Sequence, residues 1–222
     1  MYGGEIFAPS VGGGSIPHLG AVGPPVCRMR GDNPHMTQRI SGPAAEPLTL
    51  AEAKDFLRLT DPSTDALVGA LLSAARRTIE SATGRVLMTQ SWRLVRDAWP
   101  ASGLFLLPIA PVASLDAARV RRADGTWEEV HAGRLSLLGD RTPQLIGLDR
   151  AHLPQPAVDH GGIVLDVTAG YGPAPADVPP DLLQAVRLTL AHFHEHRDVV
   201  GEAIGLPGTV LALIAPYRML RL

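Results

Sequence analysis

The spacing of apolar residues changes twice along this chain, and each change marks a different kind of secondary structure. Residues 49–84 and 179–215 repeat apolar residues at helical spacing, whereas residues 86–172 carry short β-branched and apolar runs broken by Gly, Pro and Asp. The pattern predicts an α+β fold, in which a small helical bundle has an antiparallel β region inserted between its second and third long helices.

The first helical region contains the signals for two helices. Thr49 followed three residues later by Glu52 fits a capping box, which predicts a short helix to about residue 59. Asp61 and Pro62 suit the N-cap and first position of a longer helix, and Gly84 suits its end. Helical spacing over this second helix is carried by Leu67, Leu71, Ala75 and Ile79.

The β region divides into seven candidate strands separated by turn residues. We expect strands at 91–97, 104–107, 114–122, 126–131, 134–138, 144–148 and 162–169. Asp124 and Gly125 lie between the third and fourth candidates, which predicts a two-residue hairpin of type I′. A further helix should start near Asp181 and end near Arg197, and a last short helix should run from Thr209 to about residue 215.

Charged residues on the predicted elements are interpreted as solvated faces. Arg76, Arg77 and Glu80 share one side of the second helix, opposite its apolar stripe. Arg119 and Arg121 alternate with an apolar residue and therefore share one face of a strand. A partner contact by either group is the alternative.

Residues 1–47 contain nine Gly and seven Pro with almost no periodic apolar pattern. Such a segment buries too little apolar surface to offset its ordering entropy, so we expect a disordered leader at 1–47 and one domain at 48–222. A translation start at Met36 and a functional N-terminal arm are open alternatives for the leader.

Composition excludes several function classes. The net charge of −2 and the pI near 6.4 provide no basic field for dedicated nucleic-acid binding. Cys27 is the single cysteine, which rules out an internal disulfide framework or a multi-thiolate metal site. The sequence has no apolar run of membrane-spanning length and no basic segment followed by an apolar one at its start, so we expect no membrane association.

One histidine cluster is the only motif that resembles a catalytic site. His192 and His196 are four residues apart on a predicted helix, as two zinc ligands would be. The order differs from H-E-x-x-H and no third ligand is evident, while histidines at a helix C-terminus are stabilised by the helix dipole alone. Phosphate-binding loops, dinucleotide fingerprints and nucleophile elbows are also missing. We therefore expect no enzyme, no cofactor and no metal.

Several short sequence blocks follow one another in a specific order from residue 48 to the end of the sequence. They are LTLAEAK (48–54), IESATGR (79–85), QSWRL (90–94), WP (99–100), LPIAPV (107–112), TAGYG (168–172), DVP (177–179), AHFHEHR (191–197), and LP (206–207) through APYR (215–218). Their order and spacing resemble the head-tail connector, or adaptor, proteins of tailed phages and gene transfer agents. In that family the histidine block corresponds to an aromatic and charged helix end.

The resemblance implies a structural protein that forms a ring of about twelve subunits by a head-to-tail interface. Its implied partners are further copies of itself, the portal protein, a tail-side connector or stopper protein, and DNA that passes through the channel without specific binding. It implies assembly in the bacterial cytoplasm and a final place in the neck of a phage-like particle, the virion. The alternatives are a small metal-dependent hydrolase using His192 and His196, and a DNA-packaging accessory protein.

The C-terminal segment is the candidate docking element. A helix of five to seven residues is too short to be stable alone, so it must pack on something. It either caps the core of its own subunit or docks on the portal or an adjacent subunit. The candidate docking residues are Pro207, Leu211, Ile214, Pro216, Tyr217 and Arg218.

Overall fold

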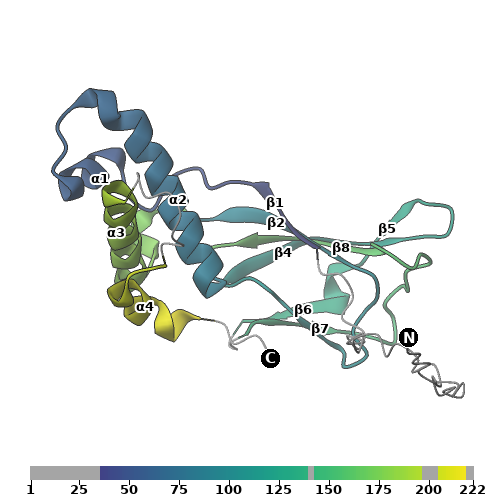
Figure 1. Cartoon of the computed structure of the whole chain (residues 1–222). Coiled ribbons are helices and arrows are strands. Elements are labelled where there is room, and N and C mark those ends of the chain that lie inside the picture. Colours follow the sequence, from purple (N-terminus) through teal and green to yellow (C-terminus); the bar gives the residue numbers. More distant parts are fainter. Residues whose placement is uncertain (1–35, 140–142, 197–204, 219–222) are drawn as a thin grey trace, which may run out of the picture. The chain divides into compact units, whose positions relative to one another are not determined.

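Helices and antiparallel strands make up the computed structural model, which describes residues 36–139, 143–196 and 205–218 (Figure 1). The α-helices are α1 (Leu50–Leu57), α2 (Asp65–Thr83), α3 (Pro180–Glu195) and α4 (Gly208–Ile214). The strands are β1 (Met36–Ser41), β2 (Gln90–Arg96), β3 (Leu104–Leu106), β4 (Val112–Arg121), β5 (Trp127–Glu129), β6 (Leu135–Leu138), β7 (Leu145–Leu148) and β8 (Ile163–Ala169). The predicted α+β class is confirmed.

Local signals set the ends of the first helices. The Thr49 hydroxyl accepts the backbone N–H of Glu52 at 3.2 Å, and the Glu52 carboxylate accepts the N–H of Thr49 at 2.8 Å, so the predicted capping box is present. Asp61 caps a 3₁₀ turn, Pro62–Thr64, and α2 begins only after that turn. Gly84 ends α2 with a φ of 70°, a left-handed conformation that glycine adopts without strain.

The strands form two antiparallel sheets. One has the order β1-β2-β8-β4-β5 and the other the order β3-β7-β6. In Figure 1, β1, β2, β8 and β4 lie side by side. Each of the seven candidate strands corresponds to an observed strand whose ends differ by at most two residues.

Strand β1 corrects the prediction that residues 1–47 are disordered. It pairs with β2 from Met36 opposite Val95 to Ser41 opposite Ser91, so residues 36–41 are ordered. Five of its six residues are exposed, because an edge strand gains its order from backbone pairing and needs little apolar pattern. Residues 1–35 of the predicted leader lie outside the described residues.

The hairpin between β4 and β5 also differs from the prediction. The Gly125 N–H bonds to the Arg122 carbonyl at 3.0 Å, and the Arg122 N–H bonds to the Thr126 carbonyl at 2.9 Å. Only Gly125 has a positive φ, 83°, while Asp124 does not. The loop therefore has three residues and ends on a left-handed glycine, and the type I′ prediction was wrong.

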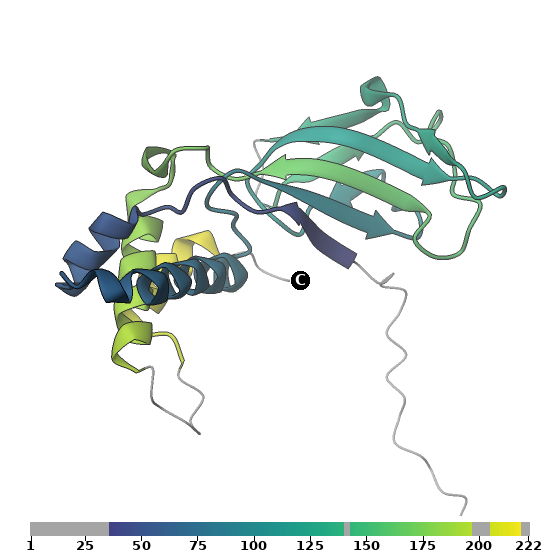
Figure 2. The same ribbon diagram turned by 90° about the horizontal axis from the view of Figure 1, so that it is seen from above.

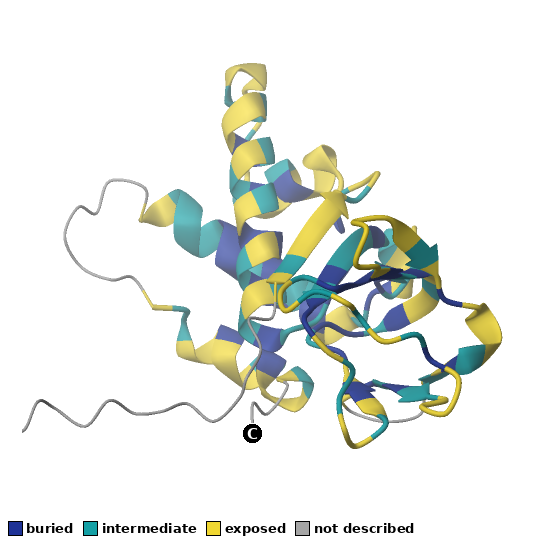
Figure 3. Cartoon of the chain, turned by 90° about the vertical axis from the view of Figure 1, so that its right-hand side faces the viewer, coloured by how far each residue is buried: buried dark blue, intermediate teal, exposed yellow. Residues whose placement is uncertain are grey.

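Buried residues form two hydrophobic cores. One lies among the strands and includes Leu94, Phe105, Ile146 and Leu165, and the other lies among the helices and includes Leu72, Ile79, Leu182 and Leu190. Figure 2 shows the helices and the strands from above, and Figure 3 shows the buried positions in dark blue. Two consecutive residues after α2 belong to different cores: Val86 is part of the strand core and Leu87 is part of the helical core.

The segments that join the helices to the strands pack closely. The Tyr171 N–H bonds to the Leu87 carbonyl at 3.2 Å. Gly170, just before it, has a φ of 133°, and a Cβ atom there would lie 2.6 Å from the carbonyl carbon of Met88. Only glycine fits this close approach of two backbones.

Candidate assembly surfaces

The C-terminal segment begins at Pro207, the N-cap of α4. The Pro207 carbonyl accepts the Leu211 N–H at 3.0 Å, which opens the helix. A 3₁₀ turn, η4 (Ala215–Tyr217), follows directly and contains Pro216. The helix and the turn together correspond to the predicted C-terminal element.

Two residues of α4 belong to the core of their own subunit. Val210 and Ile214 are four positions apart, on the same side of the helix, and both are 0% exposed in the helical core. The prediction that Ile214 contacts a partner was therefore wrong for this conformation. Leu211 is 44% exposed and lies on another side of α4, so one helix serves both the core and the surface.

The other predicted docking residues differ in exposure. Pro216 and Arg218 are exposed, whereas Pro207 and Tyr217 are half-buried. Whether any of them contacts a partner stays a prediction.

Tyr217 holds the end of this segment in place. Its carbonyl accepts the Nε–H of Arg85 at 3.1 Å, and its hydroxyl donates to Asp181 Oδ2 at 3.3 Å. Desolvation, together with the neighbouring Asp181 carboxylate, raises the pKa of Tyr217 above its ordinary value. The segment is thereby fixed to Arg85, two residues after the end of α2, and to the first turn of α3.

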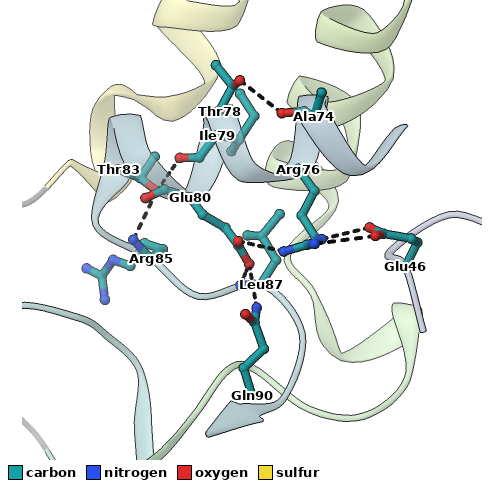
Figure 4. Close-up of polar contacts among 10 residues, drawn as sticks. All are labelled: Glu46, Ala74, Arg76, Thr78, Ile79, Glu80, Thr83, Arg85, Leu87 and Gln90. Carbon is teal, nitrogen blue, oxygen red and sulfur yellow. Dashed lines mark hydrogen bonds and ion pairs between the residues drawn. The ribbon is translucent and has the colours of Figure 1, made fainter. Parts of the chain in front are cut away.

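Arg76 is buried, which corrects its assignment to a solvated face. Its side chain donates through Nε to Glu46 Oε2 at 2.7 Å and through Nη1 to Glu80 Oε2 at 2.7 Å (Figure 4). Arg76 follows Leu72 by four residues and precedes Ile79 by three, so it lies on the buried stripe of α2. That spacing was the signal in the sequence, and the usual exposure of arginine concealed it.

Glu80 connects α2 to the beginning of the β region. Its Oε1 atom accepts the Leu87 N–H at 3.0 Å and the Gln90 side-chain amide at 2.9 Å (Figure 4). Burial raises the pKa of Glu80, while the Arg76 charge and these two hydrogen bonds oppose that shift. A carboxylate with this many donors is a structural group.

A second ionic group lies on the five-stranded sheet. Asp166 of β8 accepts from Arg93 of β2 at 2.7 and 2.9 Å and also pairs with Arg119 of β4. The hydrogen bonds from Arg93 are the main reason that the pKa of Asp166 is lowered. Arg121, on the same face, lies 5.7 Å from the ring centre of Trp127. Arg93, Arg119 and Arg121 therefore have protein partners; Arg119 is half-buried, and Arg121 is exposed, as the solvated-face prediction expected.

The histidine pair lies at the end of α3. The rings of His192 and His196 are 4.4 Å apart, but the Nδ1 atom of His196 lies 2.9 Å from the His192 carbonyl, a local contact at the helix end. His192 Nε2 is buried and has no hydrogen-bond partner in the described part of the chain. Within residues 36–139, 143–196 and 205–218, no three His, Cys, Asp or Glu side chains gather as a metal site would require.

A surface hollow of about 480 Å³ lies beside β4 and β5 and contains acidic groups. Asp116, one of its lining residues, accepts from Ser114 at 2.6 Å and from Thr168 at 2.7 Å, as a structural carboxylate does.

Across the described residues, no helix has both the length and the apolar character needed to cross a membrane.

Solved structures provide the comparison that defines the class of protein. No family model and no curated protein matches this chain. A chain in the neck of an empty gene transfer agent (GTA) particle, computed with C6 symmetry, is 33% identical with a TM-score of 0.73. Chains in the virion of a native GTA particle and in its neck, computed with C12 symmetry, are also 33% identical, with TM-scores of 0.72 and 0.70. Each match covers 84% of this chain and 97% of the other.

The three related chains are components of gene transfer agent particles, and this similarity supports a structural role in the particle neck. The match spans almost the whole of each related chain at 33% identity. The chain belongs to the family of neck proteins of gene transfer agent particles.

Proposed function

We propose that this protein is an adaptor that forms a ring between the portal and the tail of a gene transfer agent or phage particle. The observation that carries the proposal is the match to chains from GTA necks over 97% of their length. Such coverage means that the relatives and this chain share their whole domain rather than one common motif. The relation also favours a structural protein over an enzyme.

A ring of about twelve subunits fits the symmetry of the related particles, since a closed cyclic ring repeats one heterologous interface. The related necks are described with C6 and C12 symmetry. Each subunit would then present two different surfaces, one to the preceding copy and one to the next.

The charge of the chain suits a channel through which DNA passes. The net charge is −2, and Arg93 and Arg119 both pair with Asp166, whose one negative charge offsets one of their two positive charges. Every phosphate that a protein neutralises adds a salt-dependent increment to DNA affinity, which would slow passage. The proposed channel therefore guides DNA without holding it.

The C-terminal segment is the proposed contact to the portal or to an adjacent subunit. Leu211 supplies an exposed apolar side chain, and Arg218, seven residues later, supplies a positive charge. Because Tyr217 is hydrogen-bonded to Arg85 and Asp181, this surface is ordered before any partner binds. Pro207 and Pro216 bound the helix and limit its conformations.

The proposed adaptor would assemble in the bacterial cytoplasm and remain in the particle neck, with a tail-side connector or stopper protein below it. The test is native mass spectrometry and electron microscopy of the purified protein, alone and with its portal. A closed ring, or a ring on the portal, is the expected result. A protein that stays monomeric under both conditions and never copurifies with particles would contradict the adaptor function.

A further inference from the structure

The three-stranded sheet is apolar on both faces. Phe105, Leu137 and Ile146 lie opposite one another in register and face the strand core, where Phe105 is 3% and Ile146 0% exposed. The residues between them must face the other way, because side chains alternate along a strand. The outward residues are Leu104 and Leu106 of β3, Leu145 and Gly147 of β7, and Ser136 and Leu138 of β6.

Leucines form a continuous row across this outward face. Leu106 is opposite Leu145, and Leu145 is opposite Leu138, so the three side chains cross all three strands. Leu106 is 55% exposed and Leu104, on the same edge strand, is 42% exposed. The surface beside the row is recessed, because the neighbouring positions of β7 and β6 are the small residues Gly147 and Ser136. We name Leu104, Leu106, Leu138 and Leu145 the leucine row.

A solvent-facing sheet normally alternates apolar and polar residues, whereas strands covered on both faces read as nearly continuous apolar runs. None of the residues in β3, β6 and β7 is charged. Edge strands that face water are usually protected by charges, and β3 has none. The sequence of this sheet is therefore that of a surface with a partner.

We propose that the leucine row is a subunit–subunit surface, covered by a second copy of this chain. The inference rests on the proposed ring, in which each copy must bring a different surface to each of its two neighbours. The leucine row is uncharged and lies beside the small residues Gly147 and Ser136, so an apolar protein surface can pack against it. It has no positive charge that would bind the phosphates of nucleic acid. The leucine row supplies the apolar centre of one half of the interface.

The size of the row agrees with a ring contact and argues against a dimer that forms through the row alone. Three strands of about four residues cover on the order of 200 Å². A stable interface buries roughly 800 Å² on each partner, so the row can only be the centre of a larger contact. A ring provides the remainder, since each copy is held by both neighbours and by the particle.

The experiment measures whether assembly shields the row. Leu106→Cys is made in a Cys27→Ser background, and the rate of maleimide labelling is compared between dissociated subunits and purified rings. Leu67→Cys is the matched control, because Leu67 is also a leucine, 40% exposed, on α2. Leu104→Cys is the second variant should Leu106→Cys not fold, and melting temperature reports folding for each.

We expect labelling at position 106 to slow by about tenfold or more on ring formation, because the centre of an interface excludes water, while position 67 changes much less. A folded Leu106→Glu variant that no longer forms rings would also support a place for the leucine row in the subunit–subunit interface. Rings that leave position 106 fully reactive would overturn the inference and leave the adaptor function standing.

If something other than a second copy of this chain covers the leucine row, the labelling results differ, and each such result also overturns the inference. Slow labelling of free subunits that accelerates when residues 219–222 are removed would show that the chain covers its own row. Protection that appears only in whole particles would identify another particle protein. Failure of the unmodified protein to form rings under any condition would instead contradict the proposed function.

Discussion

Arg76 Nη1 lies 2.7 Å from Glu80 Oε2, one turn further along α2, and the two side chains are only 3% and 11% exposed. The same guanidinium binds Glu46 in the segment before α1, and the same carboxylate accepts from Gln90 at the start of β2. Three separate segments of the chain are therefore joined through one buried ion pair. The loss of either partner leaves an uncompensated charge in a low-dielectric environment.

Replacement of Arg76 by Ala should strongly destabilise the subunit. It leaves Glu46 and Glu80 without their cation, and breaking a buried pair in this way costs about 3 to 5 kcal/mol. Chemical denaturation measures the loss, with Arg77→Ala as the matched control because Arg77 is the exposed neighbour. Equal stability of the two variants would show that the buried pair does not form.

The Asp166 ion pairs should make stability depend on pH at the acid end. Because the pKa of Asp166 is lowered in the folded chain, its contribution is fully present above the unfolded value of about 3.9 and is lost as the pH falls through the folded pKa. Arg93 and Arg119 are partly exposed, so the contribution is about 1 kcal/mol. We expect Asp166→Asn to be less stable than the wild type at pH 7.

Urea denaturation across a pH series checks this prediction. The difference between wild type and Asp166→Asn should disappear below the folded pKa, where the native carboxyl is protonated too. Asp159→Asn, at an exposed position, serves as the control. A stability difference that stays constant down to acid pH would mean that the effect is steric and not electrostatic.

Two N-terminal deletions should differ sharply. Removal of residues 1–47 deletes β1, exposes the edge of β2, and takes Glu46 from Arg76, so we expect a clearly lower melting temperature. Removal of residues 1–35 keeps all of these contacts, and we expect little change. Differential scanning calorimetry of both proteins gives the answer. A large loss of stability on removing residues 1–35 alone would contradict the predicted disordered leader.

Much of the fold could be predicted from the sequence because many signals were local. Thr49 and Glu52 are three residues apart and cap one another, and Gly84 needs only its own backbone freedom to end α2. The candidate strands were bounded by Gly, Pro and Asp, which break regular structure wherever they occur. The order and spacing of the short sequence blocks then indicated a particle connector, and the solved structures that match are from particle necks.

The errors concern residues whose place depends on distant parts of the chain. Strand β1 exists because the edge of β2 lies beside it, and Arg76 is buried because Glu46 comes to it from 30 residues away. The docking prediction fails for Ile214 because α4 is so short that its apolar residues lie on nearly every side, and the sequence does not show which side packs on the core. The leucine row could not be recognised before the register of β3, β7 and β6 was known.

The two sides of α4 should separate folding from assembly. Ile214→Ala removes a fully buried side chain from the helical core, which costs about 2 to 5 kcal/mol, and truncation after Gly205 should prevent stable folding of that core altogether. Leu211→Ala removes an exposed side chain three residues earlier and should change subunit stability by no more than about 0.5 kcal/mol. If the segment docks as proposed, Leu211→Ala nevertheless weakens binding to the portal or to the adjacent subunit. Denaturation curves of the free subunit, followed by ring and portal-complex yields from native mass spectrometry, measure both effects. Normal assembly of Leu211→Ala together with the expected instability of Ile214→Ala would mean that α4 serves only the core of its own subunit.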